Sequence, residues 1–96
     1  MRFCFTFRPR FSSAVKAAFL DRDGVINVDY AYVHSRENFH FIPGALEGAA
    51  ELVRKGHQLI IVTNQSGIGR GKYSIDQFRE LTFWLAGVFA RNHAPL

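Results

Sequence analysis

Two pairs of polar residues in this chain have the types and the spacing that phosphoryl transfer requires. Asp21 and Asp23 follow one short apolar run, and Thr63 and Asn64 follow another. Of two carboxylates placed two residues apart beyond a strand, one can attack phosphorus as a nucleophile while the other protonates the leaving oxygen and later activates water. The hydroxyl of Thr63 and the amide of Asn64, with nearby backbone N–H groups, could hold phosphoryl oxygens. The four residues therefore predict a phosphoryl-transfer site.

This chemistry calls for a divalent cation, because carboxylates that face a dianionic phosphate would otherwise repel it. Mg²⁺ takes hard oxygen ligands, and the Asp21 carboxylate is one such ligand. Gly24 permits the sharp turn that would aim both carboxylates at one anion. A D-x-D pair taken alone also occurs as a turn cap in ordinary loops, so the prediction depends on the second polar pair as well.

Two other interpretations of these segments fail on spacing. A calcium loop would need an oxygen ligand at Val25 and a glycine at Ile26. The glycine-rich stretch 67–71 suggests a nucleotide loop, but Lys72 stands where G-x-G-x-x-G requires its last glycine, and Ser66 stands where a P-loop requires its first.

The elements that must position these residues follow from hydrophobic patterning. The apolar runs 17–20 and 58–62 predict buried parallel strands that end at Asp21 and Thr63. Between them, the spacing of apolar residues over 44–55 predicts a helix with one apolar face. Ligands in open α/β sheets bind beyond the carboxyl ends of the strands, so both polar pairs should meet in one site.

The rest of the domain supplies a loop and a second helix. Residues 22–43 have no sustained helical period and are predicted to be a long loop with an extended piece at 39–42. Ser74 and Gln77 form a capping box that opens a helix ending near Asn92. The order of strand, loop, helix, strand, loop and helix predicts an α/β fold whose two strands are parallel and joined by a right-handed crossover.

The net positive charge of the chain comes from one end. The formal net charge is +4, but residues 1–20 carry 4 of the 12 basic residues and no acid, so the other 8 basic residues balance the 8 acidic ones. We expect residues 1–16 to be a poorly ordered basic extension, with an organelle presequence or a misassigned start as alternatives, and residues 17–96 to form one small domain. The neutral domain argues against a nucleic-acid partner, since DNA binding depends on many phosphate contacts.

Cysteine usage and hydropathy indicate the cellular compartment that suits this chain. Cys4 is the only cysteine, which excludes an internal disulfide and a multi-cysteine zinc site within this chain. A reducing, cytoplasmic compartment fits this usage best. No apolar run approaches the roughly 20 residues needed to span a bilayer, so we expect no membrane partner.

Several linked motifs resemble a known family. DRDGV at 21–25 and VTNQSG at 62–67 are similar to the first and second motifs of the haloacid dehalogenase superfamily. The longer stretches NVDYAYVHSRENFHFIPGA at 27–45 and TNQSGIGRGKYS at 63–74 resemble one branch of it, the D-glycero-D-manno-heptose-1,7-bisphosphate 7-phosphatases and their histidinol-phosphate phosphatase relatives. The resemblance runs from about Lys16 to Ala90.

The resemblance implies a hydrolase, a Mg²⁺-dependent phosphomonoesterase that works through an aspartyl-phosphate. Asp21 would be the nucleophile and Asp23 the general acid and base, with Mg²⁺ held by the Asp21 carboxylate and the Asp23 backbone carbonyl. Ala31 stands where the family usually has glycine. The implied phosphate- and substrate-contacting positions are Arg22, Asp29, Tyr30, Ala31, Tyr32, Thr63, Asn64, Gln65 and Ser66.

The same resemblance implies parts that would follow Leu96, namely a cysteine-rich zinc loop, the basic residues of a third motif and the metal-binding acid of a fourth. We therefore expect a partial Rossmann-like parallel sheet of the haloacid dehalogenase type, truncated before its remaining strands. The zinc would have no ligands in this chain. The family implies a monomer at full length, whereas 96 residues alone should be inactive and prone to self-association.

The substrate expected from the resemblance is a small sugar phosphate, a heptose bisphosphate dephosphorylated at position 7. Histidinol phosphate is one alternative. A 3′-phosphorylated polynucleotide is another, because related enzymes carry a similar loop at 63–72. A non-catalytic remnant is the remaining hypothesis.

Overall fold

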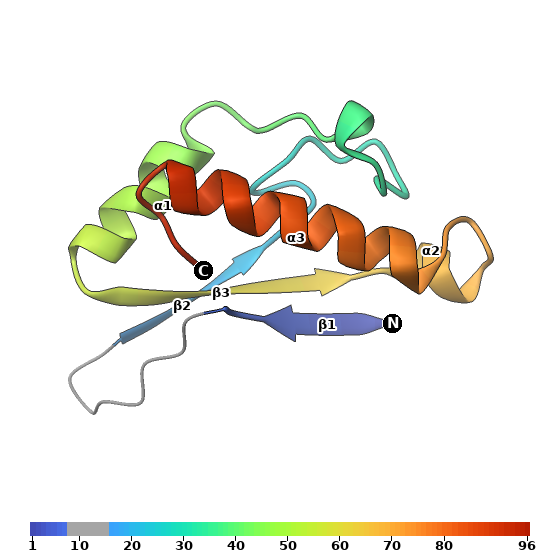
Figure 1. Ribbon diagram of the computed structural model, residues 1–96, viewed down its shortest axis with the longest axis horizontal. Helices are drawn as coiled ribbons and strands as arrows, with labels where there is room; N and C mark the ends of the chain where they lie inside the picture. Colours follow the sequence, from blue (N-terminus) through green and yellow to red (C-terminus); the bar gives the residue numbers. More distant parts are fainter. Residues whose placement is uncertain (8–15) are drawn as a thin grey trace.

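The computed structural model describes residues 1–7 and 16–96 as a three-stranded sheet with helices packed against it (Figure 1). The strands lie in the order β1-β3-β2, so β3 is central. In Figure 1 the two long helices, α1 and α3, lie on the same side of the sheet. The elements are β1 (Arg2–Phe5), β2 (Lys16–Asp21), the 3₁₀ helix η1 (Arg36–Asn38), α1 (Ala45–Arg54), β3 (His57–Asn64), α2 (Ser66–Gly69) and α3 (Ile75–Arg91).

The predicted pair of parallel strands is confirmed. β2 and β3 are hydrogen-bonded in parallel, with Ala18 opposite Leu59 and Leu20 opposite Ile61. Leu59 and Ile61 are completely buried beneath the helices. Their apolar, partly β-branched side chains favour a strand covered by other elements, and this α/β arrangement brings the carboxyl ends of both strands to one edge of the sheet.

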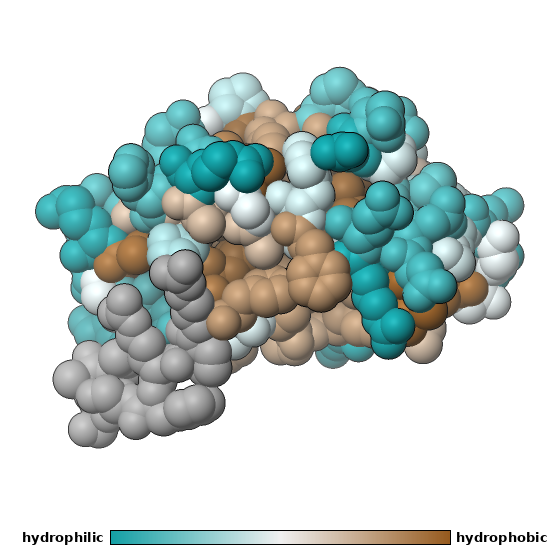
Figure 2. All heavy atoms as spheres, viewed as in Figure 1, coloured by the Kyte–Doolittle hydropathy of each residue, from teal (hydrophilic) through white to brown (hydrophobic). Residues whose placement is uncertain are grey.

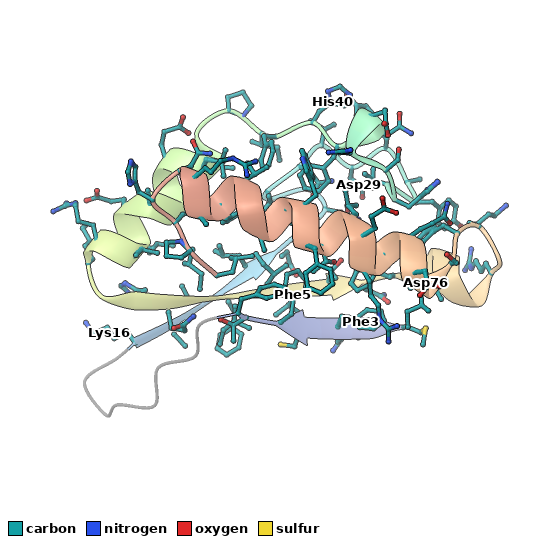
Figure 3. All side chains as sticks on the ribbon, in the orientation of Figure 1. Phe3, Phe5, Lys16, Asp29, His40 and Asp76 are labelled. Atoms are coloured by element: carbon teal, nitrogen blue, oxygen red, sulfur yellow. The ribbon has the colours of Figure 1, made fainter. Side chains whose placement is uncertain are left out.

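Strand β1 departs from the expectation of a poorly ordered extension over residues 1–16. Residues 2–5 pair antiparallel with the other edge of β3, with Phe3 opposite Thr63 and Phe5 opposite Ile61, so the sheet is mixed rather than purely parallel. Phe3 and Phe5 point from β1 towards α3 (Figure 3), and the Phe3 ring stacks on Phe78 with centroids 4.4 Å apart. This apolar burial explains the strand, because alternate side chains of a strand share one face. Residues 8–15 lie outside the described part of the chain.

Both predicted helices form. In α3 the capping box is present: the Ser74 hydroxyl accepts from the Gln77 backbone N–H at 3.1 Å, and the Gln77 side chain accepts from the Ser74 N–H at 2.8 Å. The helix ends at Arg91, within a residue of the predicted position. Its buried face consists of Phe78, Leu81, Thr82, Leu85 and Phe89.

A second side of α3 is covered by the long loop. Trp84 lies off the main buried face of the helix, and its ring packs edge-on against Phe39, with centroids 5.6 Å apart, and near Phe41 at 6.2 Å. Phe83 remains exposed, with its ring centroid 5.9 Å from that of Phe7. The extended piece predicted at 39–42 therefore serves as a cover for the helix rather than as part of the sheet.

The surface seen in Figure 2 has apolar residues gathered in the middle, over α3 and the sheet beneath it, with hydrophilic residues around them. Among the described residues, none of the helices has both the length and the apolar character needed to cross a bilayer.

Candidate active site

A cavity of about 400 Å³ lies at the carboxyl ends of β2 and β3. The parallel register places Asp21 opposite Val62, so Asp21 and Thr63 extend from neighbouring strand ends. This is the position at which open α/β sheets bind ligands. The cavity is lined by Asp21, Arg22, Asp23, Asp29, Ala31, Tyr32, Val62, Thr63, Asn64, Gln65, Ser66, Gly67 and Tyr73.

A tight turn after β2 aims the two aspartates into the cavity. The backbone carbonyl of Arg22 accepts from the N–H groups of Ile26 at 2.8 Å and Asn27 at 3.2 Å. Gly24 has a φ of 91°, a conformation that a residue with a Cβ rarely adopts. The glycine therefore has the conformational role in the turn that the sequence predicted.

The Asp23 carboxylate is held by two neighbouring side chains. Its Oδ1 accepts from Arg22 Nη2 at 3.0 Å and from Asn27 Nδ2 at 2.9 Å, whereas its Oδ2 has a single contact, 3.3 Å from Arg22 Nη2. Asn27 is completely buried. The side chain of Asp23 is thus fixed in direction, with Oδ2 the less engaged oxygen.

Arg22 was expected to contact substrate, and the structure shows its guanidinium used within the protein. The side chain is only 2% exposed. Besides Asp23 it donates to the backbone carbonyl of Val33 at 2.8 Å and lies over the Phe39 ring at 5.8 Å. Arg22 therefore joins the turn after β2 to the long loop.

The opposite wall of the cavity contains a chain of buried hydrogen bonds. The phenol of Tyr73 donates to Gln65 Oε1, and Gln65 Nε2 donates to Thr63 Oγ1 at 2.5 Å. All three side chains are buried, while Asn64 and Ser66 are exposed at the mouth. Burial raises the pKa of Tyr73, and the smaller influences of Arg22 and Asp23 lower and raise it respectively. The phenol therefore stays protonated at neutral pH.

A third wall comes from the first part of the long loop. The Asp29 carboxylate accepts from the Ala31 N–H at 3.0 Å, and Ala31 and Tyr32 both have positive φ, 62° and 55°. Arg70 donates to the Tyr32 hydroxyl at 3.0 Å, and the Lys72 ammonium lies 5.8 Å from the centre of its ring. The left-handed conformation of Ala31 gives a physical reason for glycine at this position in the family.

Ten of the eleven predicted site residues line the cavity, and Tyr30 does not. Tyr30 is exposed, and its ring packs edge-on against His40 with centroids 5.6 Å apart. Figure 3 shows Asp29 and His40 in the long loop beyond α3. Sequence reasoning missed Tyr73 and Gly67, whose signal in the sequence was an aromatic residue next to a glycine-rich polar loop.

The donor set suits Mg²⁺ better than a metal that needs many side-chain ligands. No group of three or more His, Cys, Asp or Glu side chains in the described residues could hold a metal ion. Asp21 offers a carboxylate in the cavity, and none of the backbone hydrogen bonds in the described loops uses the carbonyl of Asp23. Mg²⁺ is commonly bound by one or two protein oxygens and completed by water and phosphate, so these two groups fit it.

Similar proteins were found by sequence. The chain is 56% identical over 81 residues to the D-glycero-beta-D-manno-heptose-1,7-bisphosphate 7-phosphatase of Haemophilus influenzae, which covers 84% of this chain and 44% of that protein. It is 56% identical over 79 residues to the protein of the same name from Vibrio cholerae, covering 82% of this chain and 42% of that protein. The chain thus spans less than half the length of these relatives. No protein-family model matches it.

Two solved structures share the fold. The D,D-heptose 1,7-bisphosphate phosphatase from B. bronchiseptica, complexed with magnesium and phosphate, has a TM-score of 0.79 and 30% identity, and the match covers 85% of this chain and 46% of that one. A protein from Mesorhizobium loti named as a HAD-like phosphatase has a TM-score of 0.84 and 30% identity, covering 99% and 46%. Both comparisons confirm the resemblance predicted from the two motifs.

Proposed function

We propose that this chain, which is similar in sequence and fold to part of the haloacid dehalogenase-type heptose bisphosphate phosphatases, carries the nucleophile and phosphate-binding groups of a phosphomonoesterase. The observation that carries the proposal is the meeting of Asp21, Asp23 and Thr63 in one cavity at the ends of two parallel strands. Carboxylates occupy one side of it, and hydroxyl and amide groups occupy the other. This arrangement suits attack on a bound phosphoryl group.

In the first step, a carboxylate oxygen of Asp21 attacks phosphorus. The new O–P bond forms as the bond from phosphorus to the substrate oxygen breaks, and Asp23 gives its proton to that leaving oxygen. In the second step, Asp23 takes a proton from water, whose oxygen attacks the phosphorus of the aspartyl-phosphate. Inorganic phosphate leaves, Asp21 is again a free carboxylate, and Asp23 is again protonated.

The surroundings of Asp23 indicate which oxygen would move the proton. Oδ1 is occupied by Arg22 and Asn27, whereas Oδ2 has a single longer contact. We assign proton transfer to Oδ2. When bound by the Asp21 carboxylate and the Asp23 carbonyl, Mg²⁺ would offset the negative charge of the phosphate and of these carboxylates.

We propose a heptose 1,7-bisphosphate as the substrate, dephosphorylated at position 7. The names and 53–56% identity of curated relatives support this choice, as does the even balance of charge outside the first 20 residues, which suits a small molecule better than a nucleic acid. A cytoplasmic setting is part of the proposal and depends on the single cysteine.

A chimera tests the proposal directly. This chain would replace the matching 44% of the Haemophilus influenzae relative, and phosphate release would be measured with and without Mg²⁺. Heptose bisphosphate, histidinol phosphate and a 3′-phosphorylated oligonucleotide would be compared. We expect Mg²⁺-dependent release, fastest from the heptose bisphosphate. Preference for the oligonucleotide would reverse the assignment of substrate class, and no release from any of the three would contradict the proposed function.

Variants of the two aspartates separate their roles within this chimera. Asp21→Asn should lower turnover by roughly a thousandfold or more, because the amide cannot act as the nucleophile. Asp23→Asn should slow the hydrolysis of sugar phosphates far more than the hydrolysis of aryl phosphates, whose leaving groups need no proton. Turnover of Asp21→Asn within about tenfold of the parent would contradict its assignment as the nucleophile. Equal losses for sugar and aryl phosphates in Asp23→Asn would contradict the acid role of Asp23.

A further inference from the structure

We propose that Tyr73 is a positioning residue that acts through Gln65 to hold the Thr63 hydroxyl as a hydrogen-bond donor to the bound phosphoryl group. The inference rests on the proposed function, because it assigns the phosphate to the cavity that Thr63 lines. Tyr73 itself is not assigned a contact with the reacting atoms. Its role follows from the direction of two hydrogen bonds.

The hydrogen-bond inventory of the three side chains gives that direction. The Tyr73 phenol donates to Gln65 Oε1, so the carbonyl end of the amide is occupied and its NH₂ end is turned to Thr63. Gln65 Nε2 then donates to Thr63 Oγ1 at 2.5 Å. A hydroxyl that accepts through its oxygen still has one hydrogen to donate. Among the described residues that hydrogen has no recorded acceptor, and Thr63 lines the cavity.

The ring of Tyr73 is held in place from two sides. A Cβ added to Gly67 would lie 2.3 Å from a Tyr73 ring carbon, so only glycine permits this approach. The His34 ring stacks on Tyr73 with centroids 5.0 Å apart and an interplanar angle of 8°. His34 is itself oriented by its Nδ1, which lies 2.7 Å from the carbonyl oxygen of Tyr32.

Loss of the phenol hydroxyl would therefore change more than one contact. In a Tyr73→Phe variant the buried Gln65 Oε1 would have no donor, which is costly for a buried carbonyl. The amide can recover a partner by turning so that Oε1 accepts from the Thr63 hydroxyl. That rotation uses the hydrogen that would otherwise reach the phosphate.

The experiment is a double-mutant cycle on the binding of inorganic phosphate in the presence of Mg²⁺, measured by titration calorimetry on the chimera with the Haemophilus influenzae relative. The variants are Tyr73→Phe, Thr63→Val and the two combined. We expect Tyr73→Phe alone to weaken binding about fivefold, the usual effect of one hydrogen bond, and to have less than about a twofold effect when Thr63 is already valine. Thr82→Val, which removes a buried hydroxyl from α3 outside the cavity, should leave the affinity unchanged.

The outcomes separate this inference from the function on which it rests. If the parent chimera binds no phosphate with Mg²⁺, the proposed function and the inference both fail. If the parent binds phosphate and Tyr73→Phe weakens binding equally with threonine or valine at position 63, the ring has only a structural role and the inference alone is wrong.

A second measurement needs no phosphate. Buried hydroxyl hydrogens that are held in hydrogen bonds exchange slowly enough to be seen by proton NMR. We expect a Tyr73 hydroxyl signal in the parent, and we expect the Thr63 hydroxyl to become protected in Tyr73→Phe as Gln65 turns towards it. A Thr63 hydroxyl that is already protected in the parent would show that its hydrogen points to Gln65, which overturns the inference.

Discussion

Arg22 and Asp23 are adjacent in the chain and form a tightly held ion pair at the edge of the cavity, with Nη2 and Oδ1 3.0 Å apart. The arginine side chain is 2% exposed and the aspartate side chain 23% exposed. Because the same guanidinium also donates to the Val33 carbonyl, the direction of the proposed acid depends on the packing of the long loop.

Replacing Arg22 should therefore loosen both the turn and the loop. We expect Arg22→Met to lower the free energy of unfolding by about 2–3 kcal/mol, since it leaves Asp23 and the Val33 carbonyl without their buried donor. Arg22→Lys should recover only part of the lost free energy of unfolding, because an ammonium group cannot make the same forked set of hydrogen bonds. Urea denaturation is the measurement. Arg79→Met is the control, because it removes an exposed ion pair in which Arg79 and Asp76 are 3.7 Å apart. Its free energy of unfolding should stay within about 0.5 kcal/mol of the parent. Equal losses for Arg22→Met and Arg79→Met would contradict the structural role of Arg22.

Gly67→Ala tests the close packing of α2 against Tyr73. The added methyl would overlap the Tyr73 ring at 2.3 Å and the Tyr32 ring at 2.8 Å, so we expect a loss of about 2 kcal/mol in the free energy of unfolding. Gly69→Ala is the matched control, because nothing lies within 4 Å of its added Cβ. It should be neutral or stabilising by about 0.5 kcal/mol. If thermal or urea unfolding cannot distinguish the two variants, the close packing of Gly67 against the Tyr73 ring is wrong.

Ala31→Gly should stabilise the protein. Ala31 has a φ of 62°, and a left-handed conformation costs a residue with a Cβ roughly 1–2 kcal/mol. Glycine removes that cost but loses more entropy on folding, so we expect a net gain of about 0.5–1 kcal/mol. The same change at Ala90, in the exposed part of α3, should instead destabilise by about 1 kcal/mol. A loss of stability in Ala31→Gly would argue against the left-handed loop.

The raised pKa of Tyr73 predicts a loss of stability in alkali. Burial holds its pKa above the ordinary value of about 10, so the folded state retains the phenol proton when the unfolded state has released it. The stabilising contribution is therefore complete below about pH 10 and is lost as the pH rises through the folded pKa. We expect the free energy of unfolding to fall more steeply above about pH 10 in the parent than in Tyr73→Phe. Identical pH profiles would show that Tyr73 is not the group responsible.

Local patterning was sufficient to predict the elements that place the motifs. The apolar runs before Asp21 and Thr63 and the capping box at Ser74 each depend on residues a few positions apart, and all three appear in the structure. Parallel pairing then followed from the order of the elements. For that reason the sequence alone could predict that one cavity would group most of the loop residues with Asp21, Asp23 and Thr63.

Contacts between distant segments could not be predicted in the same way. Strand β1 forms because Phe3 meets Phe78, 75 residues further along, and the basic residues around it had suggested a tail. The family resemblance placed Arg22 among the substrate-contacting positions, yet Val33 and Phe39 close over it. Tyr73 reaches Gln65 only because Gly67 leaves room and His34 packs on its far side.

The sequence by itself determined the type of chemistry that we propose, because the candidate nucleophile, acid and anion-binding groups are recognised by residue type and by their distance from a strand end. Tertiary structure decided which of these side chains are free to act and which are occupied. Arg22 is used to hold Asp23, and Gln65 is used to orient Thr63. The physical reason is that a buried polar group must find its partners nearby in space, and the partners nearby in space are set by the packing of the whole domain.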